Sequence, residues 1–316
     1  MNSDHRESLG SGIVTGTTGE QIEISQQASR AIVTTVGAGL RLFEVNGVLY
    51  TETFGDDEEP PMGAGAVLVP WPNRVAGARW MLDGQPQDLE LTEPARGNAI
   101  HGLVRHETWT VTERTKSRVS LEVSVDARPG WPFPFRTTIS YELGLRGLNV
   151  THGVYNLSEA TMPFGVGAHP YLRPGTAHME DCDLKLAATT LLLTDDVRKV
   201  PIGQMLDTRN TKYDFRRGEL LCNLELDHTF GGCRARGGGL IKHSIRGREG
   251  GVELWADPSF GWVQVFTPYD FPGARGGFAV AIEPMTCPPD ALNSGVGLLH
   301  LAPGESWTGR WGIMPL

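Results

Sequence analysis

Residues 135–143 read FRTTISYEL, and their side chains alternate in character along the chain. Phe135, Ile139 and Leu143 fall on one side of an extended backbone, while Arg136 and Glu142 fall on the other. A period of two predicts a strand that buries only one face, as in antiparallel sheets. Residues 119–125, VSLEVSV, repeat the pattern, so the middle of the chain is predicted to form β-sheet.

Short segments of similar character recur on both sides of this stretch, separated by turn-forming residues. They lie near 31–36, 79–82, 108–113, 148–156, 252–256 and 262–267. The 40 glycines and 21 prolines are scattered through all 316 residues, which leaves little room for long helices. Asp83-Gly84 after residues 78–82 predicts a hairpin turn.

Helical periodicity is confined to a turn or two around residues 290–299, and strands do not alternate with helices. The first residues are polar and rich in Gly and Ser. We therefore expect a loose segment over 1–20, followed by a single all-β domain over 21–316. Its most easily built form is a large antiparallel β-sandwich.

The chain carries 28 basic and 37 acidic side chains, a formal net charge of −9. Nucleic acids and anionic membranes require a concentrated positive field, so we expect neither as a partner. No apolar run approaches the ~20 residues of a membrane span, and the N-terminal residues lack the pattern of a secretory signal. Four scattered cysteines without a CxxC indicate no disulfide framework, so a cytoplasmic location is expected.

Sequence fingerprints of bound cofactors and metals do not occur. There is no GxGxxG opening a helix and no GxxxxGK[ST]. There is no HxH or HExxH, and His101 and His106 are five residues apart. A metal site would need ligands from distant segments, so we expect neither a metal nor a cofactor.

Two turn-rich segments in the first half of the chain present polar groups. Residues 68–74, LVPWPNR, form a stiff loop that offers Asn73 and Arg74, a donor and acceptor set suited to hydroxyl-rich or anionic ligands. In residues 99–102, AIHG, Gly102 allows close approach beside His101. Taken singly, a solvent-exposed arginine and a structural histidine are the simpler interpretations.

Three segments in the second half carry titratable groups. In FGVGAHPYL, residues 164–172, small residues leave room in front of His169, and Tyr171 adds an aromatic face. Glu283 ends the apolar run 278–282 and is followed by a proline, which restricts its backbone. Asp227, in LDHTF, is a weaker candidate.

At these residues the sequence resembles the aldose 1-epimerase (galactose mutarotase) family. The matching motifs occur in the family's order over roughly residues 65–295. They are Pro72-Asn73-Arg74 with Asp83-Gly84, His101-Gly102, Gly167-Ala168-His169-Pro170-Tyr171, Leu226-Asp227-His228-Thr229-Phe230, and Glu283-Pro284 with Ala291-Leu292-Asn293. The resemblance implies a large β-sandwich and a mutarotase, an isomerase of carbohydrate metabolism that needs no cofactor.

The resemblance also implies roles for individual residues. Glu283 would be the general base and His169 the general acid, with His101 assisting near the ring oxygen. Four more residues would hold the sugar: Asn73, Arg74, Asp227 and Tyr171. One departure is that Gly102 is followed by Leu103 where the family commonly has a second glycine.

Other functions remain open at this point. A carbohydrate-binding protein on the same scaffold would need no acid and base pair. A glycoside hydrolase would use Asp227 and Glu283 as two carboxylates. Among mutarotases, the substrate is either a neutral hexose or an anionic sugar bearing phosphate or sulfonate, which the altered segment and Arg105 would accommodate. The expected partner is a small sugar, and the expected assembly is a monomer or homodimer.

Overall fold

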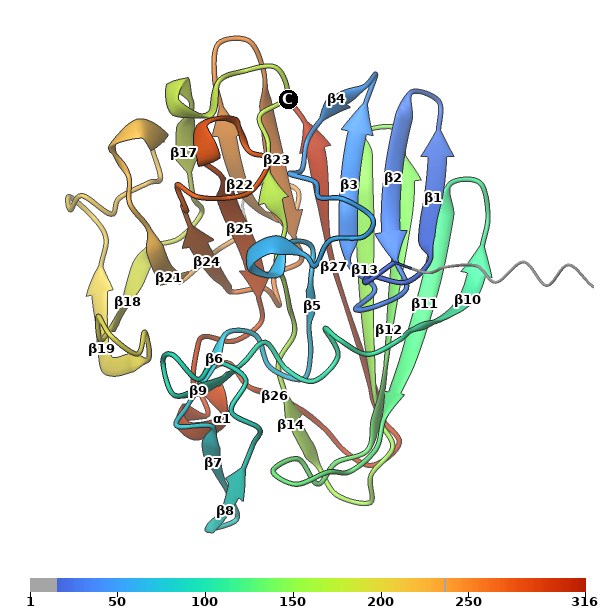
Figure 1. Ribbon diagram of the computed structural model, residues 1–316. Coiled ribbons are helices and arrows are strands. Elements are labelled where there is room, and N and C mark those ends of the chain that lie inside the picture. The colour runs from blue at the N-terminus through green and yellow to red at the C-terminus, as the bar shows by residue number, and fades with distance from the viewer. Residues whose placement is uncertain (1–15, 236) are drawn as a thin grey trace, which may run out of the picture.

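The computed structural model describes residues 16–235 and 237–316, and the regular secondary structure of these residues is almost entirely antiparallel β-strand (Figure 1). Residues 1–15, most of the segment expected to be loose, lie outside the described residues. In the rest of that segment, Thr18 is buried and donates a hydrogen bond to the carbonyl of Asp56.

The larger of the two main sheets has nine strands. Its order is β10-β11-β12-β13-β27-β23-β22-β17-β20. The strands are β10 (Thr110–Arg114), β11 (Arg118–Val125), β12 (Phe135–Gly144), β13 (Gly147–Asn156), β27 (Ser306–Pro315), β23 (Gly251–Ala256), β22 (Ile241–Arg246), β17 (Asp183–Lys185) and β20 (Glu219–Leu220). Strand β12 buries alternate residues, which confirms the prediction made from the stretch 135–143.

The second main sheet has eight strands. Its order is β19-β18-β21-β24-β25-β15-β5, with β16 also paired to β25. The strands are β19 (Pro201–Asp207), β18 (Thr190–Thr194), β21 (Asp227–Gly231), β24 (Trp262–Phe266), β25 (Val280–Met285), β15 (Gly167–Ala168), β5 (Val67–Leu68) and β16 (Tyr171–Leu172).

Smaller elements cover the ends and edges of the two main sheets. A four-stranded sheet packs on β11 and β12, and three strand pairs and a few short helices complete the fold. They are β1 (Gln21–Gln26), β2 (Ser29–Thr34), β3 (Leu40–Val45), β4 (Val48–Leu49), β14 (Met162–Phe164) with β26 (Leu299–Leu301), β6 (Arg74–Ala76) with β9 (Asn98–Ile100), β7 (Arg79–Leu82) with β8 (Gln85–Asp88), η1 (Pro61–Gly63), η2 (Met179–Asp181), η3 (Leu221–Asn223), η4 (Arg275–Gly277) and α1 (Ala291–Ser294).

Several short elements match their sequence predictions closely. Asp83 and Gly84, both with positive φ, form the two-residue turn of the β7–β8 hairpin, which projects from the molecule in Figure 1. The only α-helix within the described residues is the single turn α1, inside the stretch 290–299. All four cysteines are free, and no described helix has the length and apolarity needed to cross a bilayer.

The two main sheets bury their facing side chains in one continuous core. Ile245 and Leu254 enter it from the nine-stranded sheet, and Val263, Val265 and Ile282 from the eight-stranded sheet. Because side chains alternate along a strand, the residues between these point to the outer faces of the sandwich. Gln264 and Glu283 therefore lie on the outer face of the eight-stranded sheet, where they line one cavity together with residues at η1, β6 and β9.

Candidate functional site

Strand register places the two principal candidates, His169 and Glu283, next to each other. Strand β25 pairs Gly167 with Met285 on one side of His169 and Tyr171 with Ala281 on the other. Counting inward from either pair puts His169 opposite Glu283. His169 Nε2 lies 3.4 Å from Glu283 Oε1, and both side chains are buried. Residues 114 positions apart in the sequence thus form one pair.

The other neighbour of Glu283 is Gln264, which faces it across the β24–β25 ladder. The Gln264 amide donates a 2.8 Å hydrogen bond to Asp227 Oδ1, and its carbonyl accepts one from the Thr229 hydroxyl. Three adjacent strands therefore carry Asp227, Gln264 and Glu283 on one face, with Asp227 held in place by Gln264.

A second group of polar residues lies at the end of the β6–β9 pair, where Asn73 precedes β6 and His101 follows β9. The His101 N–H donates to the Asn73 carbonyl at 2.9 Å, and the Asn73 N–H donates to His101 Nδ1 at 3.3 Å. Both residues have positive φ, near 57° for Asn73 and 65° for His101, which is uncommon outside glycine. The reciprocal bonds hold these two strained turns together and point both side chains into the same cavity.

Arg74 is fixed by a carboxylate that sequence reasoning did not find. Its Nε and Nη2 donate to the two oxygens of Glu93, each at 2.9 Å. Glu93 also pairs with Arg96 at 3.4 Å and accepts a hydrogen bond from the Asn98 amide. Arg74 is thus held as a rigid donor at the wall of the cavity.

The motif around Asn293 makes hydrogen bonds that hold the strand β6, which carries Arg74, in place. Asp290 Oδ1 accepts hydrogen bonds from the Ala76 N–H and from the Asn293 amide, and the Asp290 N–H donates to the Arg74 carbonyl. Asn293 also donates to the carbonyl of Arg79. Residues 290–293 therefore have a structural role, because they fix the position of the strand that carries Arg74.

These residues enclose a cavity of about 380 Å³ above the outer face of the eight-stranded sheet. The volume is within the usual range for small-molecule sites. Its lining is Met62, Gly63, Asn73, Arg74, Thr92, Glu93, Arg96, Ile100, His101, Arg105, His169, Asp227, Gln264, Phe266 and Glu283. It combines carboxyl, amide, imidazole and guanidinium groups with one aromatic ring, a set suited to a polyhydroxylated ligand.

Burial shifts the two central pKa values in opposite directions. Desolvation, with a smaller contribution from the Asp227 charge, raises the pKa of Glu283 to about 8, against a weaker opposing effect of Arg74. Desolvation lowers the pKa of His169 to about 4, and the positive charges of Arg105 and Arg74 act in the same direction. Glu283 Oε2 and His169 Nδ1 have no hydrogen-bond partner within the described residues. Perturbed pKa values in a cleft are typical of functional sites.

His101 is held as a neutral donor. Desolvation, and then the charge of His169, lower its pKa well below the ordinary value. Because its Nδ1 accepts from Asn73, the hydrogen of the neutral ring is on Nε2. The ring meets His169 edge-on, with centroids 5.4 Å apart.

Tyr171 is the one predicted site residue that does not line the cavity. Its ring stacks on His169, with centroids 5.2 Å apart, and it is buried behind the imidazole. Its hydroxyl donates to the Met62 carbonyl at 3.3 Å. Tyr171 therefore supports the orientation of His169 from the side away from the cavity.

The small residues before His169 also differ from their expected role. A Cβ on Gly167 would lie 2.8 Å from Pro72 Cβ, and one on Gly165 would lie 2.3 Å from Cys287 Sγ. They make space for neighbouring protein chain rather than for a ligand. His106, the other histidine of the 101–106 pair, is exposed and is not part of the cavity lining.

The sequence analysis named seven of the residues that line this cavity and missed three important ones. The seven are Asn73, Arg74, His101, Arg105, His169, Asp227 and Glu283. It missed Glu93, Arg96 and Gln264. Gln264 is the single amide in the otherwise apolar run WVQVF, and that break in the pattern was a usable signal. Within the described residues, no group of three or more His, Cys, Asp or Glu side chains is arranged to hold a metal ion.

Comparison with known proteins points to one family. A family model described as aldose 1-epimerase matches residues 20–313. The YihR protein of Escherichia coli K12 is 30% identical over 288 residues, which cover 91% of this chain and 90% of that protein. A maltose epimerase of Levilactobacillus brevis is 32% identical, over 60% of each chain.

Solved structures share the fold at lower identity. A galactose mutarotase-like protein from Clostridium acetobutylicum aligns with a TM-score of 0.81 and 20% identity, over 94% of this chain and 95% of its own. An aldose epimerase homologue from C. elegans aligns with a TM-score of 0.79 and 18% identity, over 94% and 98%. The all-β sandwich predicted from the sequence is confirmed as the galactose mutarotase-like fold.

Proposed function

Since the chain belongs to the aldose 1-epimerase family, whose model spans residues 20–313, we propose that it is a mutarotase. It interconverts the α and β anomers of an aldose by opening and reclosing the sugar ring. The observation that carries the proposal is the buried Glu283–His169 pair, with Nε2 and Oε1 3.4 Å apart at the base of a hydrogen-bonding cavity.

The geometry of the pair suits the reaction. Ring opening removes a proton from the C1 hydroxyl and adds one to the ring oxygen, and both oxygens are bonded to C1. Two catalytic groups that lie side by side can therefore serve both atoms at once. The adjacency of Glu283 and His169 suits this reaction, because the two reacting oxygens are themselves neighbours.

Every proton that is transferred when the ring opens is returned when the ring closes. The Glu283 carboxylate takes the C1 hydroxyl proton, the bond from C1 to the ring oxygen breaks, and the ring oxygen takes a proton from the His169 imidazolium. The open-chain aldehyde then rotates about C1–C2, and the same steps in reverse close the ring on its other face. The open-chain state leaves Glu283 protonated and His169 neutral, the forms that burial favours for both groups.

The remaining cavity residues have roles as hydrogen-bonding partners of the sugar. His101 Nε2–H is a neutral donor for the ring oxygen or an adjacent hydroxyl. Arg74 and Asn73 donate from one wall, and the second oxygen of Asp227 accepts from the floor. Phe266 offers an apolar surface to the sugar ring.

The same pair favours this function over the two alternatives. A glycoside hydrolase needs two carboxyl groups across a glycosidic bond, but the partner of Glu283 is an imidazole, and Asp227 has one of its two oxygens bonded to Gln264. A protein that only binds sugar gains nothing from burying Glu283 and His169 with one polar atom of each lacking a hydrogen-bond partner within the described residues, since such burial costs free energy.

Arg105 favours an anionic sugar over a neutral hexose. Arg74 and Arg96 share the Glu93 carboxylate, whereas Arg105 lines the same cavity and makes no ion pair within the described residues. Burial of Arg105 lowers its pKa, so its charge is partly desolvated. A phosphate or sulfonate on the sugar would supply the missing partner.

Anomer-exchange NMR on a panel of sugars tests the proposal. The panel contains glucose, galactose, maltose and glucose bearing a 6-phosphate or a 6-sulfonate. We expect faster exchange for at least one sugar, with the anionic ones preferred. The variant Arg105→Gln should lose that preference while retaining exchange of neutral sugars. Absence of acceleration for every sugar would contradict mutarotase activity, and a preference unaffected by Arg105→Gln would contradict only the anionic assignment.

A further inference from the structure

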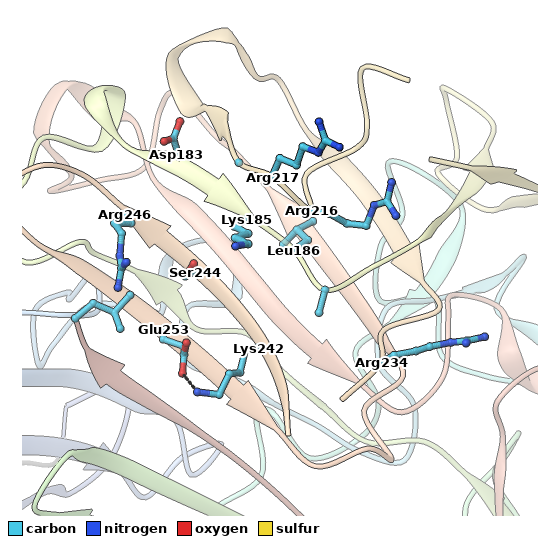
Figure 2. Close-up of a pocket in the computed structure, with 13 residues that line it drawn as sticks. Asp183, Lys185, Leu186, Arg216, Arg217, Arg234, Lys242, Ser244, Arg246 and Glu253 are labelled. Atoms are coloured by element: carbon cyan, nitrogen blue, oxygen red, sulfur yellow. Dashed lines mark hydrogen bonds and ion pairs between the residues drawn. The ribbon is translucent and has the colours of Figure 1, made fainter. Parts of the chain in front are cut away.

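A second cavity, of about 400 Å³, lies on the outer face of the nine-stranded sheet (Figure 2). Lys242 and Arg246 of β22 point outward there, because their neighbours Ile241, His243 and Ile245 are buried. Glu283, by contrast, lies on the outer face of the other sheet. The two cavities are thus on opposite sides of the sandwich and have no lining residue in common.

The second cavity is strongly basic, although the whole chain has a net charge of −9. Its basic side chains come from the sheet and from two loops beside it, and Asp183 and Glu253 are its only acidic ones. They are Lys185, Arg216, Arg217, Arg234, Lys242 and Arg246.

Only part of this positive charge is neutralised. Lys242 pairs with Glu253 at 2.7 Å, as Figure 2 shows, and Arg216 pairs with Asp214 at 2.7 Å. The other four basic side chains make no ion pair to a carboxylate within the described residues: Lys185, Arg217, Arg234 and Arg246. Like charges gathered in a concave surface repel one another and attract an anion.

We propose that this basic groove binds a small phosphorylated metabolite. Arginine presents a planar fork of donors that matches phosphate oxygens, and the groove is lined by Arg217, Arg234 and Arg246 from three different segments. Lys185 and the Ser244 hydroxyl add a point charge and a neutral hydrogen-bonding group between them.

The size and charge of the groove favour a small ligand over a nucleic acid. A nucleic acid needs a basic surface that follows its backbone, and the acidic balance of the rest of the chain repels a long polyanion. The groove also has no lining histidine and only two carboxyl groups, one of them paired. It therefore has no acid and base pair, and its role is binding.

Isothermal titration calorimetry at low ionic strength, with inorganic pyrophosphate as the probe, tests the groove. Binding to the intact protein is expected at sub-millimolar concentration. The double variant Lys185→Gln/Arg246→Gln removes two exposed charges from the groove and should weaken binding tenfold or more. The loop variant Arg217→Gln/Arg234→Gln should weaken it to a similar extent.

The matched control is Lys116→Gln/Arg146→Gln, which makes the same charge change at two exposed turns of the same sheet. It should change the affinity less than twofold, and all variants should keep their anomer-exchange rates on a neutral sugar. If the intact protein fails to bind pyrophosphate at millimolar concentration, or if control and groove variants weaken binding equally, the groove is not a phosphate site.

Discussion

Which atom carries a proton decides what each residue of the candidate site can do. In the unliganded protein, Glu283 keeps a proton up to about pH 8, and His169 is neutral down to about pH 4. In the proposed mechanism, the active form has the same number of protons, but one of them has moved from Glu283 to His169. Between these two values the pair holds a single proton, so the active form is accessible throughout.

The pH dependence of kcat/KM follows from this arrangement. The acid limb should lie near pH 4, where His169 gains a proton while Glu283 remains protonated, and the basic limb near pH 8, where Glu283 loses its proton. This reverses the assignment expected for an ordinary carboxylate and imidazole, in which the acid limb belongs to the carboxylate. Polarimetry on a non-ionisable sugar measures the profile, and a basic limb near the ordinary histidine value of about 6.5 would contradict it.

Under the proposed function, Glu93 is a positioning residue, because it holds the Arg74 guanidinium at the cavity wall. Replacing it by Gln removes the charge that fixes Arg74 but keeps the side-chain shape, so Glu93→Gln should raise KM by about tenfold with little change in kcat. The matched control is Glu90→Gln, at an exposed position close by in the chain. Equal KM values for the two variants would show that Arg74 does not depend on Glu93.

Elements act in this molecule mainly by bringing together residues that are distant in sequence. Alternation in 135–143 was enough to predict β12, because one strand buries one face. The partners of Gln264 could not be predicted, because they depend on strand register and only the folded sheet sets it. Asn73 and His101 were recognised singly, but their reciprocal hydrogen bonds arise from the β6–β9 pairing.

The turn after β9 allows a test of whether close backbone packing positions His101. Gly102 has φ near 74°, and a Cβ there would lie 2.1 Å from the Val69 carbonyl oxygen. Gly84 has φ near 78° but nothing within 4 Å of its Cβ position. Gly84→Ala should therefore cost only the backbone strain, about 1–3 kcal/mol.

Gly102→Ala must in addition move backbone next to His101, so its Tm should fall further and its kcat should drop as well. Differential scanning calorimetry and the anomer-exchange assay compare the two variants. Equal losses of Tm, with normal kcat in Gly102→Ala, would show that the close contact with Val69 has no role in placing His101.

At the scale of the whole molecule, several titratable groups are buried in their neutral forms. Desolvation lowers the pKa of His152 to about 3 and that of His243 to about 4, and it also lowers those of His101 and His169. Each of these histidines takes up a proton near pH 6.5 when the chain unfolds, but not while it is folded. Glu283 acts in the opposite direction, because it holds a proton when folded and releases it on unfolding.

Stability should therefore fall as the pH falls below about 6.5. Four histidines against one carboxyl give a net uptake of about three protons on unfolding between pH 5 and 6, and each is worth ~1.4 kcal/mol per pH unit. From pH 7 to 8 only the Glu283 effect remains, and stability should decline slightly. Tm measured from pH 5 to 8 checks this, and a Tm at pH 5 equal to that at pH 7 would contradict it.

The most direct test of the account is the anomer-exchange rate of Glu283→Gln. The substitution keeps the shape of the side chain but removes the base, so kcat should fall by ~10²–10⁴-fold while the sugar still binds. His169→Asn should show a similar loss, and the double variant should be less than multiplicatively worse, because both groups serve one coupled proton transfer. Glu305→Gln, at an exposed carboxyl group, is the control. A folded Glu283→Gln protein with near-normal kcat on its preferred sugar would contradict the mechanism.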